Sequence, residues 1–308
     1  MGAKRAIIVG IGALSLVLPG AAVADRPAAA PASFAAAKPQ ATPAARAEAF
    51  NDPFGVRMIH ATRSGGRTWF SRWTSARTLA PGQTDPRDPE LQNRGTGTFA
   101  IAADGTATAS GTTNRHYIWD PSSAKKWQNV EVTFYASYRK RPPVAGAPPP
   151  PPSGLIIEVR TGDGHVDDPA RQCAGASYSI ALYDDGRAEF KKEAKHPIYS
   201  SRNPSARVWE GSAPMPQDRW IGFKATVRDV PGGVALTLYR DVTDGASGGT
   251  WTKVLEYKDA GAWSVGDGSA ICGKPANRIL TGAHPVVLLR NDNALTRYKK
   301  ASVREIAD

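Results

Sequence analysis

The segment from residue 158 to residue 196 concentrates side chains that can carry out acid–base chemistry on an anionic substrate. It holds guanidinium and ammonium groups that bind carboxylates, imidazoles that can accept a proton, and a phenol that can donate one. The candidate catalytic residues are Arg160, His165, Tyr178 and His196, and the candidate substrate-binding residues are Glu158, Lys191, Glu193 and Lys195. The set predicts a site for a negatively charged ligand.

A hairpin must position these residues. The Asp185-Gly186 dipeptide between two apolar runs indicates a two-residue turn, which makes Tyr178 the cross-strand partner of Glu193. On this register one face carries Tyr178, Lys191, Glu193 and Lys195, and the core-facing side carries Ser179, Ala181, Tyr183, Ala188 and Phe190. A slip of one residue would exchange the two faces.

The rest of the chain from residue 50 onwards follows period two, with no stretch of ten or more residues that carries a helical stripe. The strongest strand patterns cover residues 130–138, 155–160, 178–183, 187–193, 220–227, 234–239, 251–257, 286–290 and 301–306, and Arg115–Trp119 is expected as an earlier strand that lines the ligand groove. We therefore predict one all-β domain, an antiparallel β-sandwich, over residues 50–308. The proline-rich segment 142–153 is expected to be a surface loop, because proline cannot donate to a β-ladder.

The block from residue 127 to residue 306 resembles secreted concanavalin A-like β-jelly-roll proteins, in particular the jelly-roll polysaccharide lyases that act on alginate and glucuronan. The segments that carry the resemblance are Trp127–Val132, Tyr183–Arg187, Arg219–Lys224 and Ser302–Ile306. Two lyase signatures, a Gln-Ile-His triplet and a Tyr-Phe-Lys-Ala-Gly strand, are absent. The resemblance implies a concanavalin A-like jelly roll whose concave sheet face binds the ligand.

The resemblance also implies cleavage of a uronic-acid polysaccharide by β-elimination. Arg160 would neutralise the sugar carboxylate, and His165 or His196 would remove the C5 proton. Tyr178 would protonate the leaving oxygen. No metal is required for this reaction.

Three other interpretations stay open. The first is a glycan-binding or cell-envelope module without chemistry. The second is a glycoside hydrolase, with Glu158 and either Glu189 or Glu193 as its two carboxylates, although the Glu-x-Asp-x-x-Glu motif of jelly-roll glucanases is absent. The third is a solvated face with cross-strand ion pairs. Whether the chain is an enzyme is therefore undecided from sequence.

Cys173 and Cys272 are the only cysteines, and a disulfide between them is expected in an exported protein, with two buried free thiols as the alternative. Neither has a Cys or His at zinc-ligand spacing. Asp163, Asp167 and Asp168 offer oxygen ligands to Ca²⁺, but an Asp-rich turn explains them as well. We expect no metal and no other cofactor, because nucleotide-binding and zinc-protease motifs are also absent.

The first 24 residues have the layout of a secretory signal peptide: Lys4-Arg5, an apolar run over residues 6–23, and small residues before a cleavage site after Ala24. An uncleaved anchor is the alternative. Residues 25–49 are rich in Ala and Pro and are expected to be a disordered linker. The chain carries 39 Lys and Arg against 28 Asp and Glu, a net charge of +11. We therefore expect a secreted monomer that binds an acidic polysaccharide or another anionic glycan.

Overall fold

The computed structural model describes residues 51–142, 153–164, 170–197, 199–210, 213–292 and 294–307, with the backbone alone for 199–204. The described residues belong to one compact unit, Glu48–Asp308. The expected signal peptide and linker, His165, the pair Asp167-Asp168 and most of the proline-rich loop lie outside the described residues.

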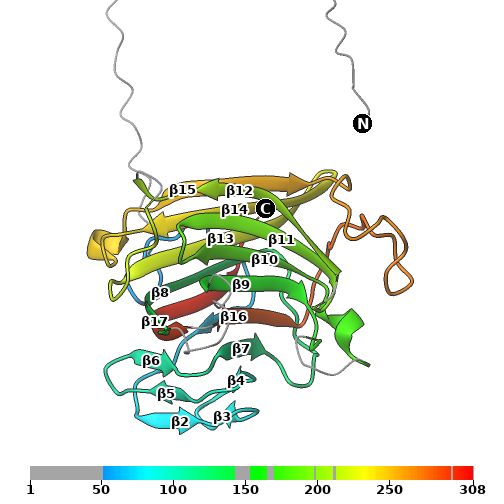
Figure 1. Ribbon diagram of the computed structural model, residues 1–308. Coiled ribbons are helices and arrows are strands. Elements are labelled where there is room, and N and C mark those ends of the chain that lie inside the picture. The colour runs from blue at the N-terminus through cyan, green and yellow to red at the C-terminus, as the bar shows by residue number, and fades with distance from the viewer. Residues whose placement is uncertain are drawn as a thin grey trace, which may run out of the picture. The chain divides into compact units, whose positions relative to one another are not determined.

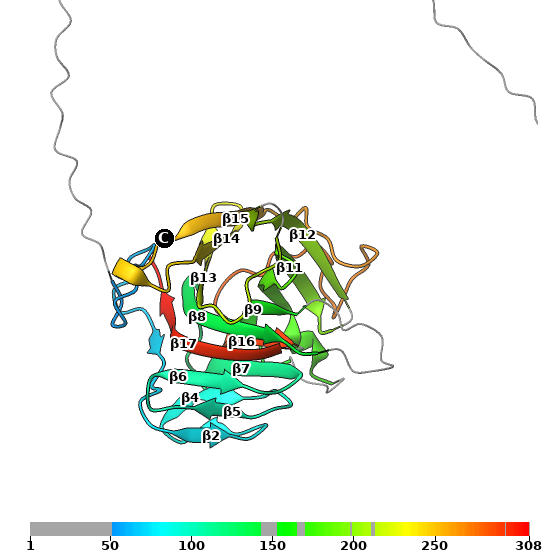
Figure 2. The ribbon, with the colours of Figure 1, turned by 60° about the vertical axis from the view of Figure 1, so that its left-hand side comes forward.

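Two antiparallel sheets form the molecule. The first sheet has the order β15 (Thr252–Asp259), β14 (Gly233–Asp241), β13 (Ile221–Val230), β8 (Val130–Lys140), β17 (Ala294–Glu305), β6 (Thr106–Ala109), β5 (Phe99–Ile101) and β2 (Arg77–Leu79), and β1 (Thr68–Phe70) also pairs with β17. The second sheet has the order β12 (Tyr199–Arg207), β11 (Arg187–Lys195), β10 (Ser177–Tyr183), β9 (Gly154–Thr161), β16 (Val286–Asp292), β7 (Thr113–Trp119), β4 (Asp88–Asn93) and β3 (Thr84–Asp85). Figures 1 and 2 show both sheets running from β15 and β12 at one end to β2 and β3 at the other. Short 3₁₀ turns, η1 (Gln172–Gly175) and η3 (Ala246–Gly248), lie in the connections.

The core lies between the sheets, and strand alternation explains why. In β8, Val130, Val132 and Phe134 point into the core, whereas Glu131, which alternates with them, points away from it. Phe134 stacks on Phe223 of β13 with ring centroids 5.2 Å apart, and residues of β9, β10, β11 and β16 complete the same core cluster. The predicted all-β antiparallel jelly-roll sandwich is confirmed.

The hairpin between β10 and β11 differs from the prediction by one residue. The amide of Gly186 donates to the carbonyl of Tyr183 at 3.0 Å, and Gly186 has φ +88°. The loop is therefore the three residues 184–186, with glycine in the left-handed position that such loops require. Consequently Leu182 pairs with Ala188, and Ser177 pairs with Glu193. The predicted partnership of Tyr178 with Glu193 is wrong.

The predicted disulfide is confirmed. Cys173 in η1 is bonded to Cys272, with their Cα atoms 5.8 Å apart and 99 residues apart in sequence. The bond joins the turn before β10 to the long connection between β15 and β16. Within the described residues, no helix is long and apolar enough to cross a bilayer.

A buried ion cluster holds the N-terminal segment on the outside of the first sheet. The Glu131 carboxylate accepts a hydrogen bond from Lys224 Nζ and forms an ion pair with Arg304 Nη2, both at 2.7 Å. It also accepts the amides of Ile59 and His60, each at 3.0 Å. Lys224 Nζ donates in addition to the carbonyl of Arg57. We call Glu131, Lys224 and Arg304 the arm cluster, because it ties residues 57–60 to the sheet.

Candidate functional site

The face of the second sheet that points away from the core is the candidate site, and we call it the outer face. Core residues such as Ile157, Ile180 and Phe190 alternate with the residues of this face along β9, β10 and β11. The outer face comprises Arg115, Tyr117, Trp119, Glu158, Ser177, Ser179, Tyr183, Glu189, Lys191, Glu193, Leu288, Arg290 and Asp292, which the strand register places in neighbouring positions. Most of these residues are polar or charged.

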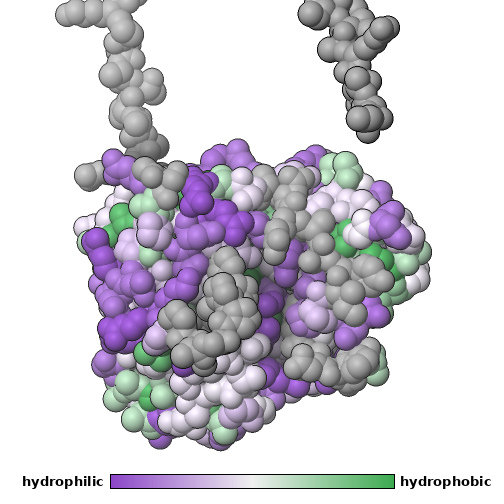
Figure 3. Space-filling model, viewed as in Figure 1, coloured by the Kyte–Doolittle hydropathy of each residue, from purple (hydrophilic) through white to green (hydrophobic). Residues whose placement is uncertain are grey.

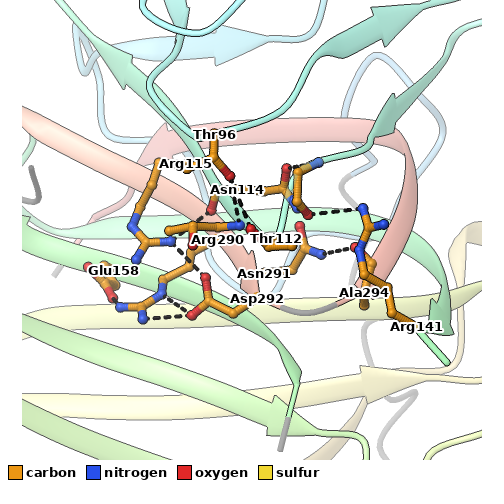
Figure 4. A network of polar contacts seen from close by, with 12 residues as sticks. Thr96, Thr112, Asn114, Arg115, Arg141, Glu158, Arg290, Asn291, Asp292 and Ala294 are labelled. Atoms are coloured by element: carbon orange, nitrogen blue, oxygen red, sulfur yellow. Dashed lines mark hydrogen bonds and ion pairs between the residues drawn. The ribbon is translucent and has the colours of Figure 1, made fainter. Parts of the chain in front are cut away.

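An ion-pair network crosses the centre of the outer face (Figure 4). Arg290 donates through Nη1 to Glu158 Oε1 at 2.8 Å, and through Nε and Nη2 to Asp292 Oδ2 at 2.9 and 2.7 Å. The other oxygen of Asp292 accepts from Arg115 Nη1 at 2.8 Å. We call Arg115, Glu158, Arg290 and Asp292 the central network. It links the three strands β7, β16 and β9 through side chains as well as through the backbone.

The central network is buried at one end and open at the other. The Glu158 side chain is fully buried, that of Arg290 is 15% exposed and that of Asp292 is 22% exposed. Burial alone would raise the pKa of Asp292, but the guanidinium groups of Arg290 and Arg115 outweigh it and lower this pKa. Burial likewise opposes the charge on Arg290, whereas Glu158 and Asp292 raise its pKa. Asp292 and Arg290 are therefore ionised at neutral pH.

An aromatic cluster lies beside the network. Tyr117 and Trp119 of β7 pack edge to face, with ring centroids 5.9 Å apart, and join Val286 and Leu288 of β16 in a separate apolar cluster. The Arg94 guanidinium lies over both rings, at 5.3 and 5.5 Å from their centroids. The Trp119 Nε1 donor has no hydrogen-bond partner among the described residues. This cluster gives the outer face an apolar part next to its charged centre.

Near its β12 side, the outer face carries a second polar group. Lys191 Nζ lies 3.4 Å from Glu193 Oε1, and His196 Nδ1 lies 3.2 Å from Glu193 Oε2. Ser177 Oγ contacts the same carboxylate at 3.5 Å. Glu193 is thus held between an ammonium group and an imidazole, and the strand order separates this group from the central network by β10.

Several of the predicted site residues meet on the outer face. The structure places Glu158, Lys191 and Glu193 there, with His196 at the end of β11. Lys195 is half-buried at the end of the same strand, after a break in the pairing with β12. His165 lies outside the described residues.

Tyr178 is not on the outer face. The three-residue turn pairs it with Lys192 instead of Glu193, and its side chain points into the core, where it is fully buried and its hydroxyl donates to Asp259 Oδ2 at 2.5 Å. The same hydroxyl accepts the amide of Leu280 at 3.1 Å. Burial and the bond to Asp259 raise the pKa of the phenol. The expected role of Tyr178 as a groove acid therefore loses its geometric basis.

Arg160 also departs from the expected position. It has φ +58° at an irregularity in the pairing of β9 with β16, so its side chain leaves the face that Glu158 occupies. Its guanidinium instead reaches Asp229 at 3.1 Å and Asn129 Oδ1 at 3.1 Å, at the end of the first sheet. A bulge near the end of a strand changes the direction of a side chain in this way. The alternation of apolar and polar residues in the sequence does not reveal such a bulge.

Sequence reasoning missed two members of the central network. Arg290 and Asp292 stand two residues apart at the end of a predicted strand, which places both on one face. Arg115 opens the strand that was expected to line the groove. Strand alternation therefore indicated which face these residues occupy. It could not indicate which of them contact each other, because the partners come from segments far apart in sequence; Arg115 and Asp292 are separated by 177 residues.

The described residues contain no group of three or more His, Cys, Asp or Glu side chains that could hold a metal ion. Asp163, one of the residues considered for Ca²⁺, pairs with Arg94 at 3.1 Å and also with Arg171. Its charge is thereby neutralised by the chain itself.

Comparisons with known proteins leave the family open. No protein-family model matches the chain, and no curated protein matches it in sequence. Among solved structures, basic winged bean lectin with Tn-antigen matches with 11% identity and a TM-score of 0.40, over 74% of this chain and 98% of that chain. The Emp46p carbohydrate recognition domain has 10% identity and a TM-score of 0.41, over 77% and 99%. The botulinum neurotoxin serotype D binding domain has 10% identity and a TM-score of 0.36, over 76% of this chain and 44% of that chain. Matches this distant assign neither a family nor a ligand.

Proposed function

We propose that the chain is a secreted carbohydrate-binding protein whose ligand lies on the outer face of the second sheet. The observation that carries the proposal is the open end of the central network. There, Asp292 and Arg290 are partly exposed, and Arg115 uses only its Nη1 group in hydrogen bonds among the described residues. Arg290 and Asp292, which have opposite charges, therefore both reach the surface at this end of the network, next to Arg115, whose side chain is 9% exposed.

Sugar hydroxyls fit such an arrangement because each can donate and accept a hydrogen bond at once. The guanidinium and carboxylate groups already hold each other in place, so a ligand would order few side chains when it binds. On the face of the molecule that Figure 3 shows, hydrophilic residues predominate outside the grey parts, and hydrophobic residues lie in small separate groups. This favours a polar ligand over an apolar one.

The charge balance favours an acidic polysaccharide as this ligand. A net charge of +11 raises the local concentration of a polyanion near the protein, and added salt weakens that attraction. An acidic glycan should therefore bind less tightly as the salt concentration rises, whereas a neutral glycan should be indifferent to it.

The test is a calorimetric titration of the purified chain with uronic-acid and neutral oligosaccharides. Arg115→Gln and the isosteric Asp292→Asn should weaken binding about tenfold to a hundredfold, because each removes a charge-assisted contact. Arg139→Gln is the matched control: it removes an arginine from an exposed ion pair with Asp218, on the other sheet. Unchanged affinity in the folded Arg115→Gln variant, or no binding of any glycan to the unaltered chain, would overturn the proposal.

Cleavage of the bound polysaccharide by β-elimination is a more specific prediction than binding. Because Tyr178 and Arg160 lie away from the outer face, proton transfer there would depend on His196 or His165. The same mixtures test it, since elimination creates an unsaturated uronide that absorbs ultraviolet light. A rise in absorbance that is lost in His196→Gln would support cleavage, and a constant absorbance with clear binding would reject it.

A further inference from the structure

A cavity lined by two cationic side chains and by no carboxylate opens at the ends of β9, β10 and β16. Its volume is about 420 Å³, within the range of small-ligand sites. One wall is formed by Cys173, Ala174 and Ala176, and the other by the segment that leads into β16. Lys274 and Arg278 are the charged residues of its lining. Such a cavity is electrostatically suited to an anion.

Arg278 is the residue that makes this cavity unusual. The side chain is half-buried, and its only hydrogen bond among the described residues is a long one of 3.4 Å, from Nη2 to the carbonyl of Ala194. Its Nε donor is buried without a partner. Burial lowers the pKa of Arg278, and no carboxylate acts against that shift. A partly desolvated guanidinium with spare donors is stabilised when an oxyanion supplies the missing acceptors.

The other titratable group at the cavity does not neutralise this charge. Burial lowers the pKa of His284, so the imidazole is neutral at physiological pH. One of its nitrogens lies 3.1 Å from the carbonyl of Thr281, which fixes Nε2 as the donor. The carboxylate that acts on His284, Asp229, is itself paired with Arg160. The positive charge of Arg278 and Lys274 therefore remains available.

The cavity is held in shape at three points. The Cys173–Cys272 disulfide ties one wall to the loop that carries Lys274. Lys192 Nζ donates to the carbonyl of Asn277 at 3.3 Å, and the amide of Leu280 donates to the Tyr178 hydroxyl at 3.1 Å. Because these bonds lie within the chain itself, binding would not have to order the cavity walls.

The cavity also adjoins the outer face. Ala176 lines the cavity, and the next residue, Ser177, belongs to the outer face and contacts Glu193. On the other side, Pro285 lines the cavity directly before β16, where Val286 and Leu288 belong to the aromatic cluster of the outer face; Arg290 and Asp292 lie at the far end of this strand. A chain molecule on the outer face can therefore extend towards Arg278.

We propose that this cavity binds a carboxylate or sulfate group of the glycan on the outer face and so selects acidic glycans over neutral ones. The glycan part of this inference rests on the function proposed above. The anion-binding part does not, because Arg278 and Lys274 would also hold a free oxyanion.

The experiment compares an oligoglucuronate, a sulfated oligosaccharide and a neutral oligoglucoside on the full chain by calorimetry. The unaltered chain should prefer one or both acidic ligands about tenfold or more, as charge-assisted bonds to a guanidinium predict. Arg278→Gln should abolish that preference and leave the affinity for the neutral ligand unchanged. Lys274→Gln, at an exposed position, should reduce the preference even if Arg278→Gln fails to fold. Arg139→Gln is the control for the loss of one positive charge.

A retained preference in both cavity variants would overturn the proposal while leaving glycan binding intact. If no glycan binds the unaltered chain, the proposed function fails, and titration with sodium sulfate then decides on the cavity by itself. Amide chemical-shift changes around residues 173–176 and 278–282 that disappear in Arg278→Gln or Lys274→Gln would support an anion site. No change in the unaltered chain would reject it.

Discussion

The arm cluster and the central network are two solutions to the same problem, a glutamate buried on the outer side of a sheet. Glu131 and Glu158 are both fully buried, and both bind basic side chains from neighbouring strands. Around Glu131, the further partners belong to the chain's own segment 57–62, namely backbone groups of residues 57–60 and the Thr62 hydroxyl. Around Glu158, the contacts continue through Arg290 to Asp292, which is 22% exposed.

The difference shows what each cluster can do. A closed ion cluster with backbone partners can only hold a segment in place, because no donor or acceptor is left for another molecule. An open one presents oriented charges to solvent, and this is the condition for recognition. The same residue types therefore serve stability on the first sheet and, in our proposal, binding on the second.

The largest effect should come from breaking the arm cluster. Glu131→Gln leaves Lys224 and Arg304 buried without a carboxylate, which should lower the free energy of unfolding by about 3–5 kcal/mol. Urea denaturation followed by circular dichroism measures it. Glu256→Gln, in an exposed pair with Lys253, is the matched control and should cost less than about 1 kcal/mol. Equal losses in the two variants would show that the arm cluster does not stabilise the fold.

An intermediate effect is expected at Tyr178, which separates stability from binding. Tyr178→Phe removes two buried hydrogen bonds, the one to Asp259 and the one from the Leu280 amide, but Lys192 still binds the Asp259 carboxylate at 2.8 Å. The free energy of unfolding should fall by about 1–2 kcal/mol, with the affinity for a neutral glycan and any cleavage unchanged under folding conditions. Loss of cleavage without loss of stability would instead place Tyr178 in the chemistry.

The smallest effect concerns acid stability and the open cluster. The pKa of Asp292 is lowered in the folded chain from an ordinary value of 3.8, so its contribution to stability is present above that pH and is lost as the pH falls through the folded-state value. Because the side chain is partly exposed, Asp292→Asn should reduce the acid-induced loss of stability by less than about 1 kcal/mol. Urea denaturation of both proteins, at neutral pH and at pH values below the ordinary pKa of aspartate, measures the difference. A larger reduction would mean that Asp292 is as important for stability as Glu131.

Most of the fold could be predicted from the sequence, because long strands rich in β-branched and aromatic residues show a recognisable period of two residues. The predicted runs at residues 130–138, 155–160 and 286–290 lie within β8, β9 and β16. The strands before residue 110 escaped prediction because they are only two to six residues long. β12 also escaped, since it contains a proline and many polar residues, which an edge strand tolerates.

The candidate site was accessible only in part. Glu158, Lys191 and Glu193 were placed together because they follow strand alternation, and the structure keeps them on one face. Tyr178 and Arg160 were misplaced for two local reasons, a turn one residue longer than expected and a positive φ at the end of β9. Neither the longer turn nor the positive φ changes the amino-acid composition of the strand that it affects, so the pattern of residue types does not reveal either of them.

The three-residue turn at 184–186 has a consequence for how this surface could change over evolution. Gly186 is enclosed there: a Cβ atom at this position would lie 2.1 Å from the carbonyl oxygen of Ala213, so larger residues are barred. Shortening the turn by one residue would re-pair β11 with β10 and bring Ala188, Phe190 and Lys192 to the outside without any substitution in the strand. The length of the turn thus decides which face of the sheet every residue of β11 occupies, so a single deletion in the turn would exchange the two faces of the strand while its sequence stays the same.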